Sequence, residues 1–415
     1  NKNSIDSLKI SDGFIVTAMF WFVLGIVGAI PFITYGISPV NAFFESTSGI
    51  TTTGATVLVG LDDLPKSLLI YRQMLQWVGG MGLIILVVAI MPTLGIGGGQ
   101  LFKMEVPSFE SSQRLTPRIT QNAKALWQIY LFLTISCLLA YLISGMGLFD
   151  AFAHALSTVA IGGFSTHDAS IGYFDSFAVE VVCIIFMLMS ATSFSLHYAA
   201  LYERKFLKYL YSEELKFFLS VIAISIALTI ICFATFSMLD WDTFRKSIFQ
   251  TISIVTTSGF TIDDYSLWPG YIPFLLLVGA FIGACSGSVG GGLKSWRVLI
   301  ILDQARQEII KTIHPNAVVT SRIGKKVVDA SISEKVWGFF AVYVITFIVL
   351  LVLVLMSGLD FESSFSAVGA TLNNLGPGLG EVSSNYESLS SFTKIVLSLA
   401  MILGRLEIFT LLVLL

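Results

Sequence analysis

The chain has 415 residues, of which 55% are hydrophobic and only 12% are charged, and its mean hydropathy is +0.83. Soluble domains carry roughly a quarter charged residues, and a water-soluble fold could not cover this much apolar side chain. The composition therefore predicts an integral membrane protein in a lipid bilayer. With 24 Lys and Arg against 27 Asp and Glu, the net charge of −3 shows no basic excess, so no nucleic acid partner is expected.

A series of apolar stretches is long enough to cross the membrane. About 30 Å of hydrocarbon requires roughly 20 helical residues. Eight stretches meet this length, and the sixth is interrupted by the glycine-rich string GACSGSVGGG. They lie at about 14–34, 68–92, 124–146, 177–201, 217–238, 270–300, 336–357 and 391–415.

Within each successive pair of stretches lies a shorter apolar segment that ends in Gly, Thr, Ser or Asn. About a dozen helical residues cannot cross a bilayer, so each segment is predicted to be a re-entrant helix followed by a loop. Asp150, Asp240 or Asp242, and Asp360 are candidate N-caps of three of these helices, and Pro39 lies near the start of the first. The four sequences are AFFESTSGITTTGATV, AFAHALSTVAIGGFSTHD, TFRKSIFQTISIVTTSGFTIDD and FESSFSAVGATLNNLGPGLG.

Long stretch, re-entrant segment and long stretch recur four times, and this internal repetition is the strongest organisational signal in the sequence. We predict an all-α integral membrane fold with four tandem helix–pore-helix–loop–helix repeats around one pseudo-four-fold pore. The predicted parts are an N-terminal cytoplasmic segment 1–13, repeats 14–92, 124–203, 217–300 and 336–415, and cytoplasmic linkers 93–123, 204–216 and 301–335.

The distribution of basic residues predicts the orientation. Most of the 24 Lys and Arg lie in the N-terminal segment and in the segments that join one repeat to the next. By the positive-inside rule these segments are cytoplasmic, and the re-entrant loops enter from the periplasmic side. Acidic residues are expected to line that outer mouth and to raise the local cation concentration. They include Glu45, Asp62, Asp63, Asp168, Asp175, Asp263, Asp264, Glu381 and Glu387.

Alignment of the four loops predicts an ion filter. Rings of backbone carbonyls replace the hydration shell of K⁺, and glycine allows a backbone to present them. Each aligned string has glycine in fourth place after a short helix, whose negative C-terminal dipole favours a cation. The alternative, that each glycine only caps its helix, is common for one helix but less favoured for four in register. The predicted ligands are Thr51, Thr52, Thr53, Gly54, Ala160, Ile161, Gly162, Gly163, Thr256, Thr257, Ser258, Gly259, Asn373, Asn374, Leu375 and Gly376.

These strings, together with IYRQMLQWVGGMGLIILVVAIMPTLG from Ile70 and GACSGSVGGGLKSWR, resemble the Trk/Ktr/HKT superfamily of potassium transporters. Within that superfamily the chain is similar to the bacterial TrkH-type potassium-uptake proteins over nearly all its length. The resemblance implies a homodimer with a separate pore in each subunit, in the bacterial inner membrane. It also implies cytosolic nucleotide-binding regulatory subunits of the TrkA type.

The same resemblance implies transport of K⁺, and of Rb⁺, with a preference over Na⁺ that is weaker than in dedicated channels. One glycine per string, and Asn373, Asn374 and Pro377 in the fourth repeat, distinguish this filter from the stricter potassium-channel string. Family members usually carry two further N-terminal helices. Because the chain begins with Asn1 and ends on IFTLLVLL without a polar stop, we expect further residues at either end.

A second predicted functional element is the break in the sixth stretch. A cluster of glycines unwinds a helix, since each costs about 1 kcal/mol relative to alanine. The resemblance implies a mobile loop below the filter that obstructs the pore. Close helix packing through small residues is the alternative, but it needs spaced glycines and not a cluster. The predicted gating residues here are Gly287, Ser288, Gly290, Gly291 and Gly292.

Arg405 completes the predicted gate, because it lies inside the last apolar stretch. A charge there costs at least about 2.5–3.5 kcal/mol unless it faces a cavity or a partner. Glu407 is two residues away and so faces another side of the helix. The resemblance places Arg405 toward the pore, in contact with the broken-helix loop. An arginine that snorkels to the membrane interface is the alternative.

Two rival functions are weighed against a pore. A K⁺ symporter coupled to Na⁺ or H⁺ by alternating access would need inverted repeats or membrane-embedded titratable groups. Here the repeats share one orientation, and the predicted spans are nearly free of carboxylates, with Glu407 as the exception. A membrane enzyme would need a catalytic constellation, and none is found; no organic cofactor is expected. His154 and His167 are predicted to satisfy local hydrogen bonds, and the four cysteines to be buried small residues.

Overall fold

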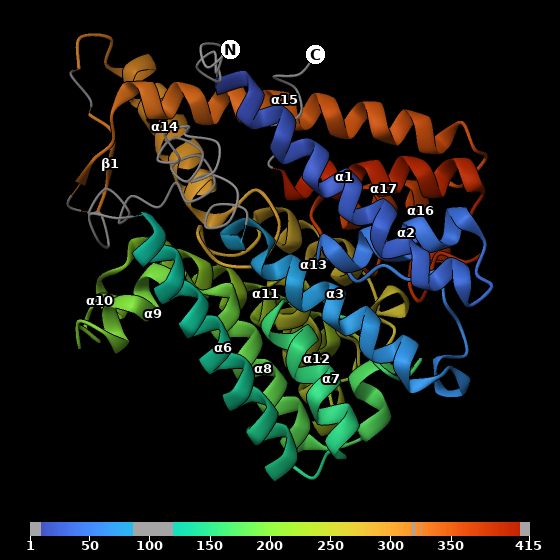
Figure 1. Ribbon diagram of the computed structural model, residues 1–415. Coiled ribbons are helices and arrows are strands. Elements are labelled where there is room, and N and C mark those ends of the chain that lie inside the picture. Colours follow the sequence, from blue (N-terminus) through green and yellow to red (C-terminus); the bar gives the residue numbers. More distant parts are fainter. Residues whose placement is uncertain (1–9, 86–118, 318–319, 325, 407–415) are drawn as a thin grey trace, which may run out of the picture.

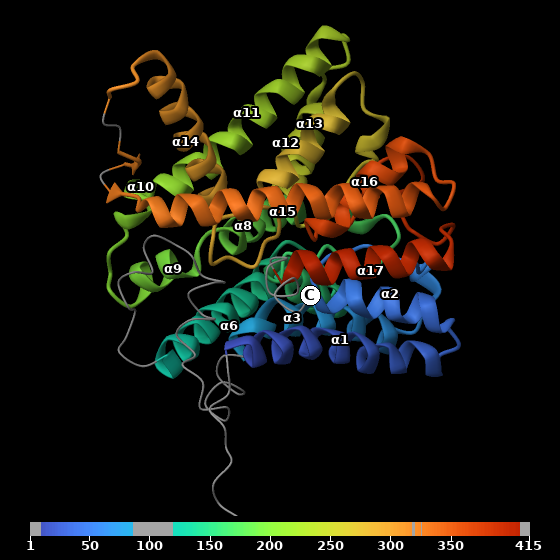
Figure 2. The ribbon, with the colours of Figure 1, turned by 90° about the horizontal axis from the view of Figure 1, so that it is seen from above.

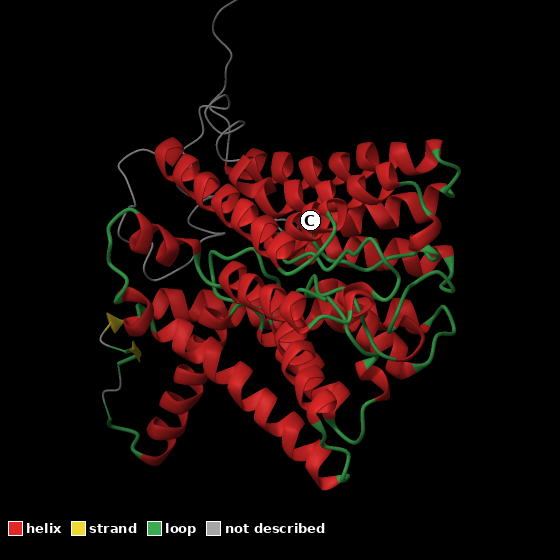
Figure 3. Ribbon diagram, turned by 90° about the horizontal axis from the view of Figure 1, so that it is seen from below, coloured by secondary structure: helices red, strands yellow, loops and turns green. Residues whose placement is uncertain are grey.

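The structure is a computed structural model that describes residues 10–85, 119–317, 320–324 and 326–406. The expectations for the segment 1–9, for the end of the second stretch, for most of the linker 93–123 and for Glu407 lie outside the described residues. The regular secondary structure of the described part is almost entirely helical, and loops connect the helices (Figure 3). Its one strand pair is a short antiparallel hairpin of β1 (Arg322–Ile323) and β2 (Lys326–Val327).

The first helix of each predicted repeat is a long apolar helix. Among the described residues, four helices are long and apolar enough to cross a membrane, and most side chains in their apolar windows are not buried by protein. Such exposed apolar surface fits a lipid environment. These helices are α1 (Ile10–Thr34), α6 (Ile119–Ile143), α11 (Glu213–Thr235) and α15 (Ala330–Leu355).

The second long stretch of each repeat is more varied. The first and last are α3 (Lys66–Ile85) and α17 (Ser391–Arg405). The stretch predicted at 177–201 is not one straight helix: α8 (Phe177–Ala191) and α9 (Phe194–Leu201) meet at 97°. The bend follows from Thr192, which has extended backbone and ends α8. The predicted break in the sixth stretch is present, between α13 (Ile272–Ile282) and α14 (Ser295–Ile313).

Four short helices stand where the re-entrant helices are predicted. At 1.5 Å per residue, their 12 or 15 residues span roughly 18–23 Å, which is too short for a bilayer. They are α2 (Pro39–Ile50), α7 (Leu148–Val159), α12 (Trp241–Val255) and α16 (Phe361–Leu372). The remaining short helices are α10 (Lys208–Tyr211), η1 (Leu61–Asp63), η4 (Ser170–Phe174), η5 (Tyr265–Leu267) and η6 (Gly380–Val382).

The N-caps of these short helices agree with the sequence in two of three acidic cases. The side chains of Asp240 and Asp360 accept a hydrogen bond from the backbone N–H three residues on, and Pro39 opens α2. The prediction for Asp150 is wrong, because Gly147 is the N-cap and Asp150 lies in the first turn. Its carboxylate is instead engaged by the Thr166 hydroxyl at 2.7 Å.

The helices pack in a closed cycle. In each predicted repeat, the helix that follows the short re-entrant helix packs against the re-entrant helix of the next repeat: α3 on α7, α8 on α12, and α13 on α16. The cycle is completed by α17, which lies against α2 at the other end of the chain (Figures 1 and 2). This packing brings the C-terminal ends of all four short helices toward one central region.

The interior contains aromatic residues and all four cysteines. Tyr130, Tyr141, Phe218 and Phe249 are fully buried. The cysteines are buried and free, as predicted. The large apolar side chains that remain exposed lie mainly on the outer faces of the long helices, and Ile143 is 88% exposed. This distribution is that of a protein surrounded by lipid, because water would disfavour so large an apolar surface.

Candidate functional site

The four predicted filter strings meet at the centre of the cycle and touch in order around a ring. A Cβ added to the glycine of each string would clash with a carbonyl oxygen of the next string, so only glycine permits this approach. The distances from these Cβ positions are 2.2 Å from Gly54 to Gly162 O, 2.2 Å from Gly163 to Ser258 O, 2.2 Å from Gly259 to Leu375 O and 2.7 Å from Gly376 to Thr53 O.

The backbone of the four strings follows one pattern. The first residue of each is right-handed or close to it, and the second and fourth have positive φ. Threonine, isoleucine and asparagine in the left-handed region cost roughly 1–2 kcal/mol each, so packing must hold them there. The φ values are 57° for Thr52, 51° for Ile161, 62° for Thr257 and 51° for Asn374, and 86°, 78°, 76° and 101° for Gly54, Gly259, Gly163 and Gly376.

The same backbone pattern shows that the fourth-place glycines do more than cap the short helices. In each string the N–H of the third residue donates to the carbonyl five residues back, at 2.8 or 2.9 Å, which closes the short helix. The left-handed residue inside this closure is the second one, such as Thr52, and not the glycine. The fourth-place glycines are therefore required by the neighbouring string rather than by the end of the helix.

A buried ion pair supports the first two strings from behind. Arg72 Nε on α3 lies 2.7 Å from Glu45 Oε1 on α2, and neither side chain is exposed. Glu45 also accepts from the Thr56 hydroxyl at 3.0 Å and from Val57 N at 2.9 Å. Arg72 in turn donates to Ser165 O at 3.2 Å. The expectation that Glu45 lines the outer mouth is thus wrong, because the arginine holds it inside the protein.

Gln76 supports the second string from the same helix. Its Nε2 donates to Gly162 O at 2.5 Å, and its Oε1 accepts from the Ser157 hydroxyl at 2.7 Å. Sequence reasoning did not assign a role to Arg72 or Gln76. The signal was present, since two polar side chains four residues apart share one face of an apolar helix.

The fourth string is held by its own asparagines. The Tyr343 hydroxyl donates to Asn373 Oδ1 at 2.7 Å. Asn374 Nδ2 donates to Thr53 Oγ1 at 2.9 Å and to Met401 O at 3.0 Å. The side chain that departs most from the other strings therefore ties the fourth string to the first.

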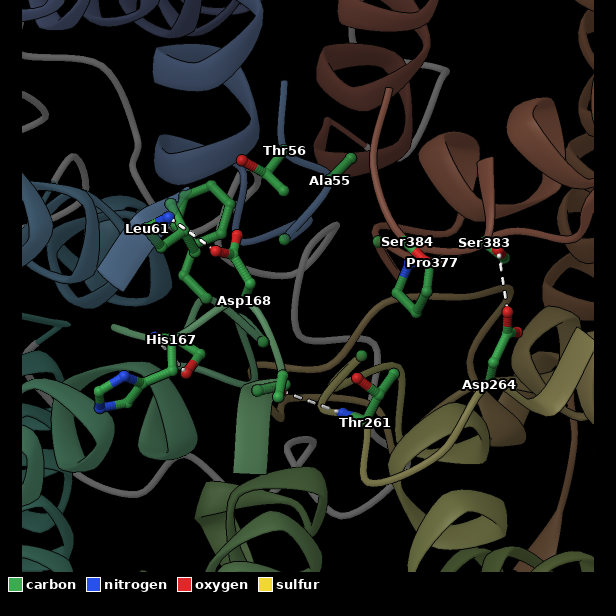
Figure 4. Close-up of a pocket in the computed structure, with 18 of the residues that line it drawn as sticks. Ala55, Thr56, Leu61, His167, Asp168, Thr261, Asp264, Pro377, Ser383 and Ser384 are labelled. Atoms are coloured by element: carbon green, nitrogen blue, oxygen red, sulfur yellow. Dashed lines mark hydrogen bonds between the residues drawn. The ribbon is translucent and has the colours of Figure 1, made fainter. Parts of the chain in front are cut away.

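A cavity of about 270 Å³ opens on one side of the ring and is lined by all four glycines. Asp168, Asp263 and Asp264 also line it, so part of the predicted acidic mouth is present. Asp168 accepts from Leu61 N at 2.9 Å, and Asp264 accepts from the Ser383 hydroxyl at 3.4 Å (Figure 4). These carboxylates are fixed in the wall and give the cavity a negative potential.

The two histidines near the second string have local partners, as predicted. His154 is buried, with Nδ1 2.8 Å from Asp150 O and Nε2 2.9 Å from Ser165 Oγ. His167 lines the cavity, and its ring stacks on Tyr173 with centroids 3.4 Å apart. Its Nδ1 contacts the carboxylate of Asp62. Both rings thus belong to the frame of the mouth.

The broken-helix loop between α13 and α14 lies directly against the ring. Gly291 N donates to the Thr257 hydroxyl at 2.7 Å, and Gly292 N donates to Asn373 O at 3.1 Å. A Cβ on Gly291 would lie 1.9 Å from that same Asn373 oxygen, so the approach requires glycine. The predicted gating residues Gly290, Gly291 and Gly292 therefore contact the predicted filter strings of the third and fourth predicted repeats.

The first half of the loop contacts the bend between α8 and α9. Cys285 N donates to Ala191 O, and Phe194 N donates to Gly287 O, both at 3.0 Å. The Ser288 hydroxyl bonds within the loop, to Cys285 O at 2.5 Å. The bend at Thr192 thus leaves the carbonyl of Ala191 and the N–H of Phe194 available for hydrogen bonds to this half of the loop.

Arg405 reaches the same loop from α17. Its guanidinium donates to Val289 O at 2.9 Å and to Gly79 O at 3.1 Å. Lys294 donates to Gly290 O from within the loop. The arginine therefore points into the protein, toward the broken helix, and the snorkelling alternative does not describe it.

A helical membrane protein whose re-entrant segments converge on one ring of backbone belongs to the class of ion-transporting membrane proteins. Comparison with known sequences specifies the class further. A family model described as "TrkH: Cation transport protein" matches residues 1–415. The chain belongs to the TrkH family, which is a family of transport proteins and not of enzymes.

Individual relatives agree over the whole chain. It is 51% identical over 420 residues to the Trk system potassium uptake protein TrkH of Halomonas elongata, and 47% identical over 427 residues to that of Escherichia coli K12. Each alignment covers 100% of this chain and 87% of the relative. The crystal structure of the potassium transporter TrkH from Vibrio parahaemolyticus is similar, with a TM-score of 0.89 and 46% identity over 100% of this chain and 87% of that chain.

Proposed function

We propose that this chain is the pore-forming subunit of a bacterial potassium-uptake system. The observation that carries the proposal is the ring of four strings, in which each fourth-place glycine allows close contact with the next string. Relatives that are 47% and 51% identical to this chain are named Trk system potassium uptake proteins. The transported ion would be K⁺, with Rb⁺ as a substitute.

The proposed ligands are the backbone carbonyl oxygens of the four strings, assisted by the C-terminal dipoles of the short helices. Not every one of these oxygens is available in the described conformation. Gly162 O accepts from Gln76, and Asn373 O accepts from Gly292 N. Fewer available oxygens mean fewer complete ion sites, which supports a preference for K⁺ over Na⁺ that is weaker than in dedicated channels.

The proposed gate is the broken-helix loop together with Arg405. The loop occupies the side of the ring opposite the cavity, because it contacts the first and second residues of the third and fourth strings. The positive guanidinium beside it would oppose the passage of cations. Displacement of the loop and of Arg405 from this position would open the path.

The direction of transport and the partners complete the proposal. The acidic cavity would face the periplasm and the basic linkers the cytoplasm, so the inside-negative voltage across the inner membrane would drive K⁺ inward, worth about 2.3 kcal/mol per charge per 100 mV. The chain would form a homodimer and bind TrkA-type nucleotide-binding subunits in the cytosol. These assignments rest on the family resemblance.

A symporter coupled to Na⁺ or H⁺ is the second candidate. Three carboxylates are buried in the described structure: Glu180 in the stretch predicted at 177–201, Glu214 in the first turn of the long helix α11, and Glu45 on the short helix α2. Each has a partner: Glu45 contacts Arg72, Glu180 contacts Arg245, and Glu214 contacts Ser286 N. Carboxylates that are already engaged favour a structural role over proton or sodium coupling, so the pore remains the preferred function.

Uptake of ⁸⁶Rb⁺ into proteoliposomes tests the two candidates. A pore takes up Rb⁺ down an imposed voltage, K⁺ competes more strongly than Na⁺, and Gly259→Ser removes that difference because its side chain would meet Leu375 O. Uptake that requires an imposed proton or sodium gradient would instead establish the symporter. Gly270→Ser is the control, because Gly270 also has positive φ but meets no heavy atom closer than 3.3 Å.

A further inference from the structure

The carboxylate of Glu214 lies at a position that the pore and its filter do not explain. Glu214 is in the first turn of α11, which begins at Glu213 within the predicted linker 204–216, and it is only 9% exposed. Its neighbour Glu213 has the opposite environment, since its side chain is 44% exposed and pairs with Lys216 at 3.0 Å. A buried carboxylate beside an exposed one needs a compensating partner.

That partner includes the backbone of the broken-helix loop. Ser286 N donates to Glu214 Oε1 at 2.5 Å, and the two residues are 72 positions apart in the chain. Hydrogen bonds to an ionised acceptor are about twice as strong as neutral ones, and burial strengthens them further. Glu214 thus contributes a charged side-chain contact to the half of the loop that lies away from Arg405.

The loop is therefore held by charges of opposite sign at its two halves. Glu214 holds the N–H of Ser286, whereas Arg405 and Lys294 hold the carbonyls of Val289 and Gly290. A peptide N–H attracts an anion and a carbonyl attracts a cation, so each charge matches the group that it meets. For the loop to leave the ring, these contacts must break.

The same turn of α11 has a second neighbour. A Cβ on Gly324, in the turn between β1 and β2, would lie 2.7 Å from Glu213 Cγ, so the hairpin packs closely on this turn. The helix α11 also packs against α14, which leaves the loop at its other end. Adjacent residues of one helical turn thus contact the hairpin on one side and the loop on the other.

We propose that Glu214 is a latch, a positioning residue that holds the broken-helix loop in the position that closes the pore. Movement of the hairpin and of the first turn of α11, as a protein bound at the cytosolic face would cause, withdraws the carboxylate and releases Ser286. The proposal rests on the proposed function of the loop as the gate. Its test therefore needs one readout of loop position and a separate readout of flux.

The loop carries a natural probe for its own position. Cys285 precedes Ser286 and is 1% exposed. In the latched position a thiol reagent should modify it slowly, and release of the latch should speed its modification. The other cysteines, Cys137, Cys183 and Cys232, are buried outside the loop and serve as internal controls when each labelled peptide is quantified by mass spectrometry.

The experiment compares Glu214→Gln with Glu213→Gln in proteoliposomes without any cytosolic partner. Glutamine keeps the size of glutamate but removes the charge, and at position 213 it keeps the Cγ that contacts Gly324. We expect Glu214→Gln to speed labelling of Cys285 and raise basal ⁸⁶Rb⁺ uptake on the order of tenfold, as expected for weakening a hydrogen bond to a charged group. Competition by K⁺ and Na⁺ should not change. Glu213→Gln should match the wild type in both readouts.

The two readouts separate the latch from the gate. Unchanged labelling of Cys285 in Glu214→Gln, with wild-type thermal stability, would overturn the latch. Faster labelling with unchanged uptake would uphold the latch and overturn the assignment of the loop as the gate. If Glu214→Gln is poorly folded, Glu214→Asp supplies the test, because its shorter side chain keeps the charge but retracts it from Ser286, and the same labelling increase is expected.

Discussion

The buried pair of Glu45 and Arg72 gives the sharpest quantitative prediction. Both side chains are essentially unexposed, at 0% and 1%, and they meet at 2.7 Å. Replacing Arg72 by methionine keeps much of the side-chain volume but leaves the Glu45 carboxylate buried without its counter-charge. Removing one partner of a buried pair costs about 3–5 kcal/mol, because the desolvation of the remaining charge is no longer compensated.

The cost should be accompanied by a loss of ion discrimination. Arg72 and Glu45 hold Thr56, Val57 and Ser165, which follow the glycines of the first two strings by two or three residues. Without the pair, the outer ends of these strings lose their support. We expect Arg72→Met to weaken the advantage of K⁺ over Na⁺ as a competitor of ⁸⁶Rb⁺ uptake.

The assay is reversible unfolding in mixed detergent micelles, with ⁸⁶Rb⁺ uptake measured in parallel. Lys311→Met is the matched control, because Lys311 is 45% exposed and contacts Glu308, which is 60% exposed. Such a surface pair contributes about 0–1 kcal/mol. Adding Glu45→Gln to Arg72→Met should restore part of the lost stability, since a neutral amide is cheaper to bury. A single variant within about 1 kcal/mol of the wild type, or a double variant no better than the single, would refute the reasoning.

Three further predictions concern the ring, the gate and a helix cap. Gly54→Ala should abolish the advantage of K⁺ over Na⁺ as a competitor of ⁸⁶Rb⁺ uptake, because the added Cβ would lie 2.2 Å from a neighbouring carbonyl oxygen. In the control Gly60→Ala, the added Cβ meets no atom within 4 Å, so this variant should cost about 1–2 kcal/mol of stability and leave that advantage unchanged. Arg405→Gln should raise basal ⁸⁶Rb⁺ uptake, with Arg405→Lys in between; equal uptake in all three proteins would contradict a gating role. Asp360→Ala should cost about 1 kcal/mol and Asp360→Asn little. Hydrogen bonds from Ser363 lower the pKa of Asp360. The contribution of Asp360 to the free energy of unfolding should therefore be fully present above the ordinary aspartate range and be lost as the pH falls through the lowered pKa. Unfolding measured at a series of pH values checks this.

The features that sequence predicted well are those that depend on neighbouring residues. The half-length helices follow from the length of each apolar run, and the break in the sixth stretch follows from glycine density between Gly283 and Gly292. The ring itself could be anticipated because four strings share a fourth-place glycine. In each case the deciding interaction lies within one short segment, or is repeated often enough to be recognised.

The features that sequence missed depend on partners far along the chain. Glu45 was expected at the mouth because its segment was predicted to enter from the periplasmic side, but whether an acid faces water depends on a cation 27 residues away. The bend at Thr192 depends on the loop backbone around Gly287, to which Phe194 donates. Similarly, the left-handed threonines and isoleucine of the ring could not be foreseen, because strain at these residues is tolerated only where tertiary packing holds it.

The four strings share a backbone conformation but not their supporting contacts, and this difference bears on the proposed gate. Gln76 donates a hydrogen bond to the second string, and Tyr343 donates one to the fourth. The third string is supported by the Ser253 hydroxyl, which donates to Phe260 O at 2.6 Å. In four identical chains every support would occur four times, and four copies of the broken-helix loop could not all occupy the space beneath one ring. Tandem repeats in a single chain remove that constraint. One repeat can supply a single loop while another supplies Arg405 to contact it, so the asymmetry of the sequence makes room for the gate that we propose.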